Sequence, residues 1–420
     1  MSWGPVNRAF NVILRGIALG AKFVLVFSLA RFLEPADVAL YGLVLATVTY
    51  VQFALGFDFY LFANRELIST ERHSWTGILR DQGVFFALAY LILLPFCLLL
   101  FVFELLPWTI AAWFFPLLVV EHLSHELSRI LIALSRPVLA TMLLFLRAGA
   151  WILVLIPAMW LAPRFRTLEW VFIAWFVGAS GACVVGAVSV ARLVRWDLRR
   201  AVDWSWVRRG VRVAAPLLVG TLALKGLNTF DRYWIEAIGG VEPLAAYVLF
   251  VGVANAIKAF LDAGVFIFSY PGLIRAARSG DAVAFRASMR GLAWQTSAAT
   301  TALVIAALVL IGPLLAWIDK PVYRAHVELL YWAVAAVVLY AAGMVFHYGI
   351  YAHRRDGAIV GSHLGGLAIF MASVGLLQAK LGFVAVPIAV CVAYASILIW
   401  KALRFFRIQA EDRNAALSHS

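Results

Sequence analysis

The feature that most constrains this chain is a series of about twelve apolar segments, each long enough to cross a bilayer. Gly83–Phe103, Thr296–Trp317 and Phe383–Trp400 are clear examples. About 20 apolar residues in a helix span about 30 Å of hydrocarbon, and such segments are too long for the strands of a membrane barrel. Hydrophobic residues make up 64% of the 420 residues and charged residues only 14%, which excludes an ordinary soluble domain.

We therefore predict an all-α polytopic membrane protein with about twelve transmembrane helices. The connections are short, and the longest, Arg195–Gly210, is basic and contains tryptophan, as is typical of an amphipathic segment on the membrane surface. The predicted helices lie near residues 9–32, 38–62, 82–103, 108–134, 139–162, 170–194, 211–235, 244–274, 291–316, 327–350, 358–378 and 383–403.

The two halves of the chain repeat one pattern. Arg31-Phe32 corresponds to Arg232-Tyr233, Glu34-Pro35 to Glu242-Pro243, and Asp58 matches Asp262 to within two residues. Because each half holds six segments, both halves enter the membrane from the same side, which predicts a parallel repeat and two bundles with a cleft between them. The predicted division is a lobe over 1–195, a cytoplasmic amphipathic linker over 196–210, a second lobe over 211–403 and a cytoplasmic polar tail over 404–420.

The distribution of lysine and arginine predicts the orientation. The chain carries a formal net charge of +13, and its basic residues gather in the loops of one side, for example Arg195, Arg199 and Arg200. By the positive-inside rule that side is cytoplasmic, so both termini are expected in the cytoplasm and the protein in the cytoplasmic (inner) membrane. We interpret the basic runs as orientation signals that touch anionic membrane lipids, and we expect no nucleic-acid partner.

Six cations lie within the predicted spans. Each costs about 2.5–3.5 kcal/mol near the centre of a lipid-facing helix, so they must be paired or face water. Glu126 precedes Arg129 by three residues and Lys258 precedes Asp262 by four, so each of these couples is expected to neutralise itself. The six are Arg15, Lys22, Arg129, Arg147, Lys225 and Lys258.

Four of these cations, Arg15, Lys22, Arg147 and Lys225, have no acid within helical reach. Arg15 and Lys22 follow Arg8 at seven-residue intervals, and Lys225, Asn228 and Arg232 form a comparable stripe on the repeat-related helix. Two such stripes predict a cationic, water-filled cleft for a large anion, a pyrophosphate or an acidic sugar. The predicted substrate-binding residues are Arg15, Lys22, Arg147, Lys225, Arg232 and Lys258.

The alternative is that acids from other helices, such as Asp58 or Glu121, pair with these cations in the folded bundle. Intramembrane acids are also the candidates for uptake of a proton or Na⁺ that resets the cleft. These coupling candidates are Asp58, Glu121, Asp231 and Asp262. No other cofactor is expected. Glu121, His122, His125 and Glu126 form a polar helix face, which we interpret as a hydrogen-bond network and not as a metal site, because no second ligand-rich helix is evident.

One stretch near the start of the chain resembles a known family. Arg31-Phe32-Leu33-Glu34-Pro35, then Tyr41-Gly42-Leu43, Gly56-Phe57-Asp58 and Asn64-Arg65-Glu66-Leu67 resemble the opening of the Wzx-like polysaccharide and oligosaccharide flippases. These belong to the MATE-related multidrug/oligosaccharidyl-lipid/polysaccharide exporter superfamily. The resemblance extends over the whole chain in size, number of spans and six-plus-six repeat.

The resemblance implies a V-shaped, two-lobed flippase that is not an enzyme. Such a protein moves an undecaprenyl-pyrophosphate-linked oligosaccharide to the periplasmic leaflet by alternating access, with a glycan polymerase and chain-length proteins as partners. The chain has no room for the two additional helices of the lipid II flippases, which favours a role in polysaccharide biosynthesis, with the repeat unit of O-antigen lipopolysaccharide, capsule or exopolysaccharide as cargo.

Two other functions remain open from the sequence. A membrane glycan polymerase or ligase would act on the same lipid-linked sugars, but the predicted periplasmic loops, such as Glu104–Pro107 and Pro163–Glu169, hold no acid/base set. A small-molecule exporter of the MATE type is the other alternative, and a basic cleft argues against cationic drugs as its cargo.

Overall fold

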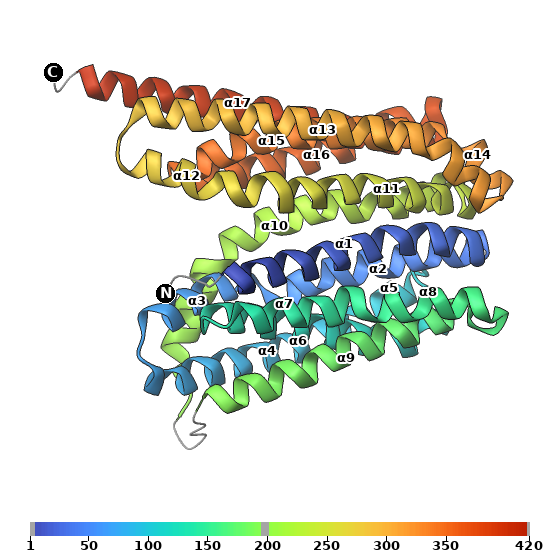
Figure 1. The fold of residues 1–420 in the computed structure, drawn as a ribbon, viewed down its shortest axis with the longest axis horizontal. Coiled ribbons are helices and arrows are strands. Elements are labelled where there is room, and N and C mark those ends of the chain that lie inside the picture. Colours follow the sequence, from blue (N-terminus) through green and yellow to red (C-terminus); the bar gives the residue numbers. More distant parts are fainter. Residues whose placement is uncertain (1–4, 195–200, 418–420) are drawn as a thin grey trace. The chain divides into compact units, whose positions relative to one another are not determined.

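The computed structural model describes residues 5–194 and 201–417, and over these residues the chain is helical, with no strand. The chain divides into two compact units, unit 1 over Met1–Leu222 and unit 2 over Ala223–Ser420. Figure 1 shows the helices of each unit in sequence colours. The predicted all-α class is confirmed.

Unit 1 contains the helices of the first half and the beginning of α10. Its short 3-10 turns are η1 (Arg72–Ser74), η2 (Trp108–Ile110) and η4 (Pro163–Phe165), and η3 (Leu146–Ala150) is a π-helix that joins α7 to α8. Its α-helices are α1 (Pro5–Phe32), α2 (Pro35–Gly56), α3 (Tyr60–Ser69), α4 (Trp75–Cys97), α5 (Leu99–Val102), α6 (Ala111–Ala133), α7 (Pro137–Phe145), α8 (Trp151–Leu161), α9 (Leu168–Leu193) and the first part of α10 (Trp204–Gly239).

Unit 2 contains the rest of α10 and all the helices after it. A second π-helix, η5 (Asp262–Phe266), joins α11 to α12, and a 3-10 turn, η6 (Gly382–Val384), separates α16 from α17. The α-helices are α11 (Val241–Leu261), α12 (Ile267–Arg278), α13 (Ala282–Ile318), α14 (Pro321–Ala325), α15 (Glu328–Ala352), α16 (Asp356–Leu381) and α17 (Ala385–Leu417).

Ten stretches in the described part of the chain are long and apolar enough to span a membrane. One of them, Asp356–Glu411, runs through both α16 and α17. Helix α6 has 23 residues but carries Glu121, Glu126 and Arg129, so it is not among the ten. Counting α16 and α17 separately and adding α6 brings the described helices of spanning length to twelve, in agreement with the prediction.

Local sequence signals explain where several helices begin. Pro35 and Pro137 occupy the first turns of α2 and α7, where the missing N–H costs nothing. Asp281 caps α13, because its Oδ1 accepts hydrogen bonds from the backbone N–H groups of Val283 and Ala284 at 3.0 and 2.9 Å. Asp203 does the same for α10, accepting from the N–H of Trp206 at 3.0 Å.

The predicted span 38–62 is not one continuous helix. Helix α2 ends at Gly56, and Phe57 and Asp58 have left-handed backbones with φ of 53° and 49° before α3 begins. An α-helix cannot continue through two left-handed residues. The hydrophobic pattern did not reveal this break, because the flanking residues Phe57 and Phe59 are as apolar as the helix itself.

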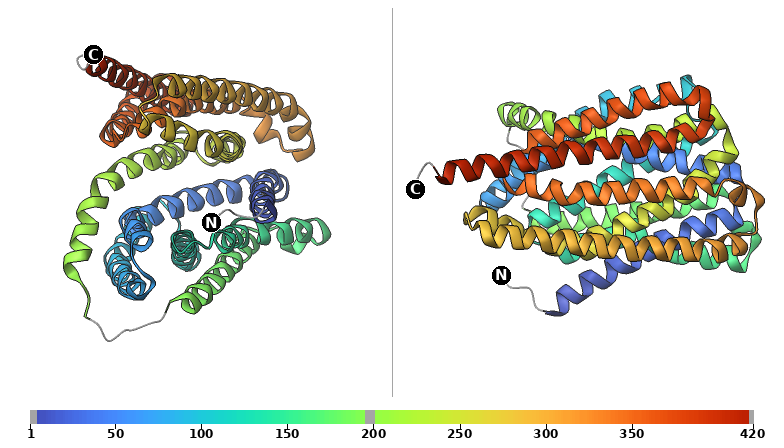
Figure 2. Two further views of the ribbon diagram at one scale, coloured as in Figure 1. Left: turned by 60° about the vertical axis from the view of Figure 1, so that its left-hand side comes forward. Right: turned by 90° about the horizontal axis from the view of Figure 1, so that it is seen from above.

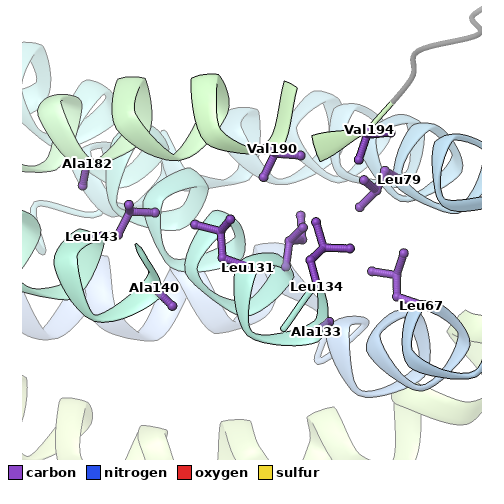
Figure 3. Close-up of a cluster of buried hydrophobic side chains, with 11 residues drawn as sticks. Leu67, Leu79, Leu131, Ala133, Leu134, Ala140, Leu143, Ala182, Val190 and Val194 are labelled. Carbon is purple, nitrogen blue, oxygen red and sulfur yellow. The ribbon is translucent and has the colours of Figure 1, made fainter. Parts of the chain in front are cut away.

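Leucines and small residues build the core of unit 1 where α3, α4, α6, α7 and α9 meet. In the cluster of Figure 3, Leu131 and Leu143 are completely buried and Leu67 is 1% exposed. Helix α9 comes close to α6 and α7 at Gly186, where an added Cβ would lie 2.7 Å from Leu143 Cδ2 and 3.0 Å from Leu127 Cβ. This core holds α6, which carries Glu121, and α7, which leads directly into the π-helix η3 that carries Arg147.

Part of the predicted linker is packed on unit 1. Residues 195–200 of that linker lie outside the described residues, but Trp206 and Val207 are buried against Phe59 and Ala63. Arg80 Nη2 also donates to the Ala201 carbonyl at 2.8 Å. The helix begins at Trp204, before the predicted start at 211, and at the other end of unit 2 α17 continues through the predicted tail to Leu417.

Candidate functional site

Intramembrane charges gather in two polar clusters in unit 1 and in one polar region in unit 2. We name the first the Glu121 cluster, made by Lys22, Glu121, Arg147 and Trp175. We name the second the Asp58 cluster, and the third the Asn228 region; their residues are given below where each is described. Each lies within a single unit.

Glu121 is the centre of the first cluster. Its carboxylate, on α6, accepts a hydrogen bond from Arg147 Nη1 at 2.8 Å and another from the indole Nε1 of Trp175 on α9 at 2.6 Å. Glu121 is 8% exposed. A buried carboxylate with two such donors is well satisfied. Arg147 therefore pairs with an acid of another helix, which was the alternative interpretation of its charge.

Arg147 stands in the π-helix η3, which passes close to α1. An added Cβ at Gly149, two residues later, would lie 3.0 Å from the Ala18 backbone Cα. This contact brings the stripe of α1 beside Arg147, because Lys22 follows Ala18 by one turn. The Nε of Arg147 is buried and has no hydrogen-bond partner among the described residues.

Lys22 is the cation of this cluster for which the described residues provide no neutralising contact. Its side chain is exposed, and it lies within electrostatic reach of both Arg147 and Glu121. Two cations thus share one carboxylate. Arg15, one stripe position earlier on α1, is half-buried, and its Nε has no partner among the described residues. Unit 1 therefore carries an excess of positive charge beside α1.

The Asp58 cluster consists of Asp58, His122, Glu126, Arg129 and Thr221. Glu126 and Arg129 form the predicted pair on α6, with Arg129 Nη1 2.5 Å from Glu126 Oε1. Asp58 accepts a hydrogen bond from the Thr221 hydroxyl of α10 at 2.6 Å. Asp58, His122 and Glu126 are 4%, 1% and 2% exposed, so the cluster is enclosed.

Aromatic residues complete the surroundings of the Asp58 cluster. The guanidinium of Arg129 lies 3.6 Å from the ring centroid of Tyr60, a cation–π contact. The Tyr90 hydroxyl lies 2.6 Å from His122 Nδ1. His122 Nε2 and Glu126 Oε2 are buried without a partner among the described residues. His122 Nε2 and the second carboxylate oxygen of Glu126, Oε1, both border Gly56. A Cβ added at Gly56 would lie 3.3 Å from each of these two atoms.

In unit 2, Asp231 and Arg232 at the middle of α10 are both buried. Asp231 accepts a hydrogen bond from the Tyr247 hydroxyl of α11 at 2.8 Å, and Arg232 Nη1 lies 3.5 Å from its Oδ1. Arg232 also donates to the Asn228 carbonyl one turn earlier. The predicted cleft cation Arg232 is therefore held within its own helix and by the adjacent carboxylate.

The Asn228 region consists of Asn228, Lys258, Tyr340 and Tyr394. Lys258 Nζ lies 3.4 Å from both Asn228 Oδ1 and the Tyr394 hydroxyl, and that hydroxyl donates to Asn228 Oδ1 at 2.9 Å. The same ammonium lies 5.0 and 5.1 Å from the ring centroids of Tyr340 and Tyr394. Every one of these partners is electrically neutral.

The predicted contact between Lys258 and Asp262 is not formed. Asp262 is the first residue of the π-helix η5, and it is exposed. It remains within electrostatic reach of Lys258 and Lys225. Lys225 is half-buried on α10. In unit 2, Lys258 therefore has no carboxylate in contact with it among the described residues.

The structure adds polar residues that the sequence analysis missed. Trp175, Thr221, Tyr247, Tyr340 and Tyr394 each contact a predicted charged residue, yet all count as apolar or neutral in a search for charges. Their signal was weak: tryptophan and tyrosine are common in membrane helices, and only their position opposite a buried charge distinguishes them.

No family model matches the chain, and no curated protein does. Solved structures match it over nearly its whole length. An inward-facing multidrug resistance MATE family transporter of the MOP superfamily superposes with a TM-score of 0.72 at 13% identity, covering 95% of this chain and 96% of that one. The chain has the MATE transporter fold. At this identity the likeness concerns the fold alone.

Two further structures of this fold match with similar coverage. MATE in its bent conformation gives a TM-score of 0.60 at 13% identity, over 97% of both chains. A MOP superfamily transporter from Pyrococcus furiosus Vc1, whose binding pocket has reverse polarity that suggests a different function, gives 0.60 at 14% identity, over 96% of both chains. The expected multi-pass membrane protein with a MATE-related fold is confirmed.

Proposed function

We propose that this protein is a flippase that moves a lipid-linked oligosaccharide, carried on undecaprenyl pyrophosphate, across the cytoplasmic membrane by alternating access. The cargo is the repeat unit of an O-antigen, capsule or exopolysaccharide. The MATE transporter fold supports the transport mode, and the resemblance of residues 31–67 to the Wzx-like flippases supports the cargo class. In this proposal both termini lie in the cytoplasm, and a glycan polymerase and chain-length proteins act after the flippase.

The observation that carries this proposal is the excess of positive charge inside the spans of both units. In unit 1, Lys22 and Arg147 share the single carboxylate of Glu121. In unit 2, Lys258 is held by neutral groups, Asn228 and two tyrosines. Each uncompensated cation costs several kcal/mol of free energy in hydrocarbon. A bound anion would offset this cost, and we therefore infer an anionic ligand. A pyrophosphate provides that compensation.

The predicted substrate residues divide by how strongly they are already held. Lys22 and Arg15 lie on α1 and have N–H groups without a hydrogen-bond partner among the described residues. We therefore assign them the direct contacts with phosphate oxygens. Arg147, Arg232 and Lys258 are each fixed by other groups, and we assign them the positive potential that attracts the cargo. Lys225 contributes to that potential beside Asp262.

We further assign cation coupling to the Asp58 cluster. His122 Nε2 and Glu126 Oε2 are buried without partners among the described residues, and both residues lie beside the break that carries Asp58. A proton or Na⁺ bound there would complete their coordination. Glu121, Asp231 and Asp262 are the other coupling candidates, but Glu121 and Asp231 already have two donors each.

Export of a small molecule, as in the multidrug MATE transporters, is the second candidate function. The structural neighbours favour it, because the inward-facing match is a multidrug resistance transporter. The charge inside the spans disfavours a cationic drug. The reverse polarity of the binding pocket in the Pyrococcus furiosus MOP transporter is a precedent for a different cargo on this fold.

The test is reconstitution of the full chain in liposomes with a fluorescent undecaprenyl-pyrophosphate oligosaccharide. Flipping is measured as the fraction of label protected from an external quencher. Lys22→Ala is expected to lower the rate about 10- to 100-fold, the effect of one lost charge-assisted hydrogen bond of about 1.5–3 kcal/mol. Lys22→Arg should retain most of the rate, and Lys380→Ala, which removes an exposed lysine at the end of α16, should be neutral.

Two outcomes would overturn the proposal. Equal rates for the wild type and Lys22→Ala would show that the cation does not contact the cargo. Transport of cationic dyes, with no flipping of the labelled lipid, would favour the small-molecule exporter. In cells, the corresponding observation is accumulation of lipid-linked sugar facing the cytoplasm in a strain without this protein.

A further inference from the structure

Three basic side chains meet inside unit 2, away from the candidate site. They are His347 of α15, His363 of α16 and Lys401 of α17, and we name them the His–Lys cluster. Lys401 is 3% exposed. Its Nζ lies 3.3 Å from His347 Nδ1 and 3.3 Å from His363 Nε2. The two imidazoles are nearly parallel, with ring centroids 6.4 Å apart.

The chemistry of these groups limits how many protons they hold. A charged lysine only donates, and an imidazole nitrogen accepts only when it carries no hydrogen. Lys401 can therefore donate to both rings only while both are neutral. A second proton on either ring would place two positive charges beside each other in the interior, which is strongly unfavourable. Loss of the proton from Lys401 leaves an amine that accepts from an imidazole N–H. Three bases thus share one proton.

The neighbouring helices supply few other charges at this point. The ionisable groups that act on His347 are Lys401 and His363. Tyr348 packs edge-on to His347 with centroids 5.6 Å apart, and it lies within reach of Asp262 of η5 and Tyr270 of α12.

Three other basic residues near these helices have contacts of their own. His353, the residue that follows α15, faces Phe285 of α13, and its Nδ1 lies 2.8 Å from the Gly349 carbonyl. On α17, Arg404 lies over the Trp400 ring. Lys258 of α11 contacts Tyr340, two turns before His347 on α15. The protonation of the cluster is therefore governed mainly by its own three bases.

We propose that His347, His363 and Lys401 form a buried proton-binding site that holds one exchangeable proton between α15, α16 and α17. Its ligand is a proton and not Na⁺ or another hard cation, because nitrogen bases line it and hard cations require oxygen ligands. His347 lies about 10 Å along α15 from the turn between α15 and α16, near His353–Arg355. The site is independent of the cargo proposed above.

The position of the site gives the proton a structural effect. Helix α17 packs against both α15 and α16 along unit 2, as Figure 2 shows for the red helix and its orange neighbours. One lysine on α17 thus bonds to one histidine on each partner. Removal of the proton changes which nitrogen donates in both contacts, so the packing of α17 depends on proton occupancy.

The test is nitrogen NMR of the full chain in lipid, with histidine labelled on both ring nitrogens, from pH 5 to 8. In the wild type, His347 and His363 should stay neutral while the exposed His73 serves as the reference resonance. In Lys401→Met, one imidazole should take up a proton within the window in which histidine ordinarily titrates, since the competing charge is gone. His347→Gln and His363→Gln assign the resonances.

Two results would overturn the inference. The first is a Lys401→Met protein in which both histidines stay neutral as in the wild type. The second is a wild-type protein in which both rings protonate independently of Lys401. If Lys401→Met does not fold, as judged by size-exclusion chromatography, Lys401→Gln keeps one hydrogen bond without the charge and carries the same expectation.

Discussion

Asp58 of unit 1 and Asp262 of unit 2 correspond in the sequence repeat, and both stand where a helix departs from α geometry. In unit 1 the helix stops, with Phe57 and Asp58 in left-handed conformation. In unit 2 it continues through the π-helix η5. Asp58 is buried and bonded to Thr221, whereas Asp262 is exposed.

Some of the cations in the two units are also stabilised differently. Unit 1 neutralises its buried cations with carboxylates, Glu121 for Arg147 and Glu126 for Arg129. Unit 2 surrounds Lys258 with an amide and two tyrosine rings. The comparison indicates that the repeat preserved the position of the helix irregularity and of the acid, while the means of stabilising nearby cations diverged.

The largest effect is expected for Glu121→Ala. This change leaves Arg147 buried without its carboxylate, which costs about 3–5 kcal/mol when a buried pair loses one partner. Thermal unfolding in detergent measures it. In unit 2, Asp262→Ala removes an exposed carboxylate and should cost less than about 1 kcal/mol. Equal costs would contradict the difference between the units.

A smaller loss is expected for Thr221→Val. The change removes the hydroxyl that donates to the buried Asp58 at 2.6 Å, and hydrogen bonds to charged groups contribute about 1.5–3 kcal/mol. Tyr394→Phe in unit 2 removes a bond to the neutral Asn228 and should cost about 0.5–1.5 kcal/mol. Denaturant titration measures the loss in the free energy of unfolding for both variants. A larger loss for Tyr394→Phe than for Thr221→Val would count against an ionised Asp58.

The two π-helices differ in how closely they are packed. Replacing one glycine in each by alanine measures this difference as a change in stability. Gly149→Ala in η3 meets the Ala18 backbone at 3.0 Å and should destabilise the protein by about 1–2 kcal/mol. Gly264→Ala in η5 has open space within 4 Å and should change stability by less than about 1 kcal/mol, in the favourable direction. Melting temperatures of both variants provide the comparison, which fails if Gly149→Ala is neutral.

The smallest effect is a pH dependence at the start of α10. Hydrogen bonds from the Ser205 hydroxyl and the Trp206 N–H lower the pKa of Asp203 below its ordinary value of 3.8. A lowered pKa in the folded state adds stability that is complete above the ordinary pKa and is lost as the pH falls through the lowered one. Asp203→Asn should therefore flatten the melting profile below about pH 4, and near pH 7 it should lower the melting temperature slightly, because the stabilisation by the carboxylate is then lost.

Much of the fold could be predicted from sequence because apolar length and helix boundaries are local properties. The pair Glu126 and Arg129 was likewise local, three residues apart on one helix. Arg147 and Glu121 stand 26 residues apart on different helices, so only packing could join them. Lys258 and Asp262 had the right spacing, but Lys258 contacts Asn228 and two tyrosines from other helices, and spacing along one helix cannot predict such partners. His347, His363 and Lys401 were overlooked for the same reason: they converge from three helices.

A π turn holds one residue more than the α turn it replaces, so η5 acts as a single inserted position in the middle of a long helix. Deleting Ala263 would restore the ordinary repeat and rotate everything from Ile267 to Arg278 by about 100° about the helix axis. The direction in which α12 presents its side chains can thus change while that of α11 stays the same. Such an insertion lets a duplicated gene revise which side chains one half of a helix presents without altering the other half.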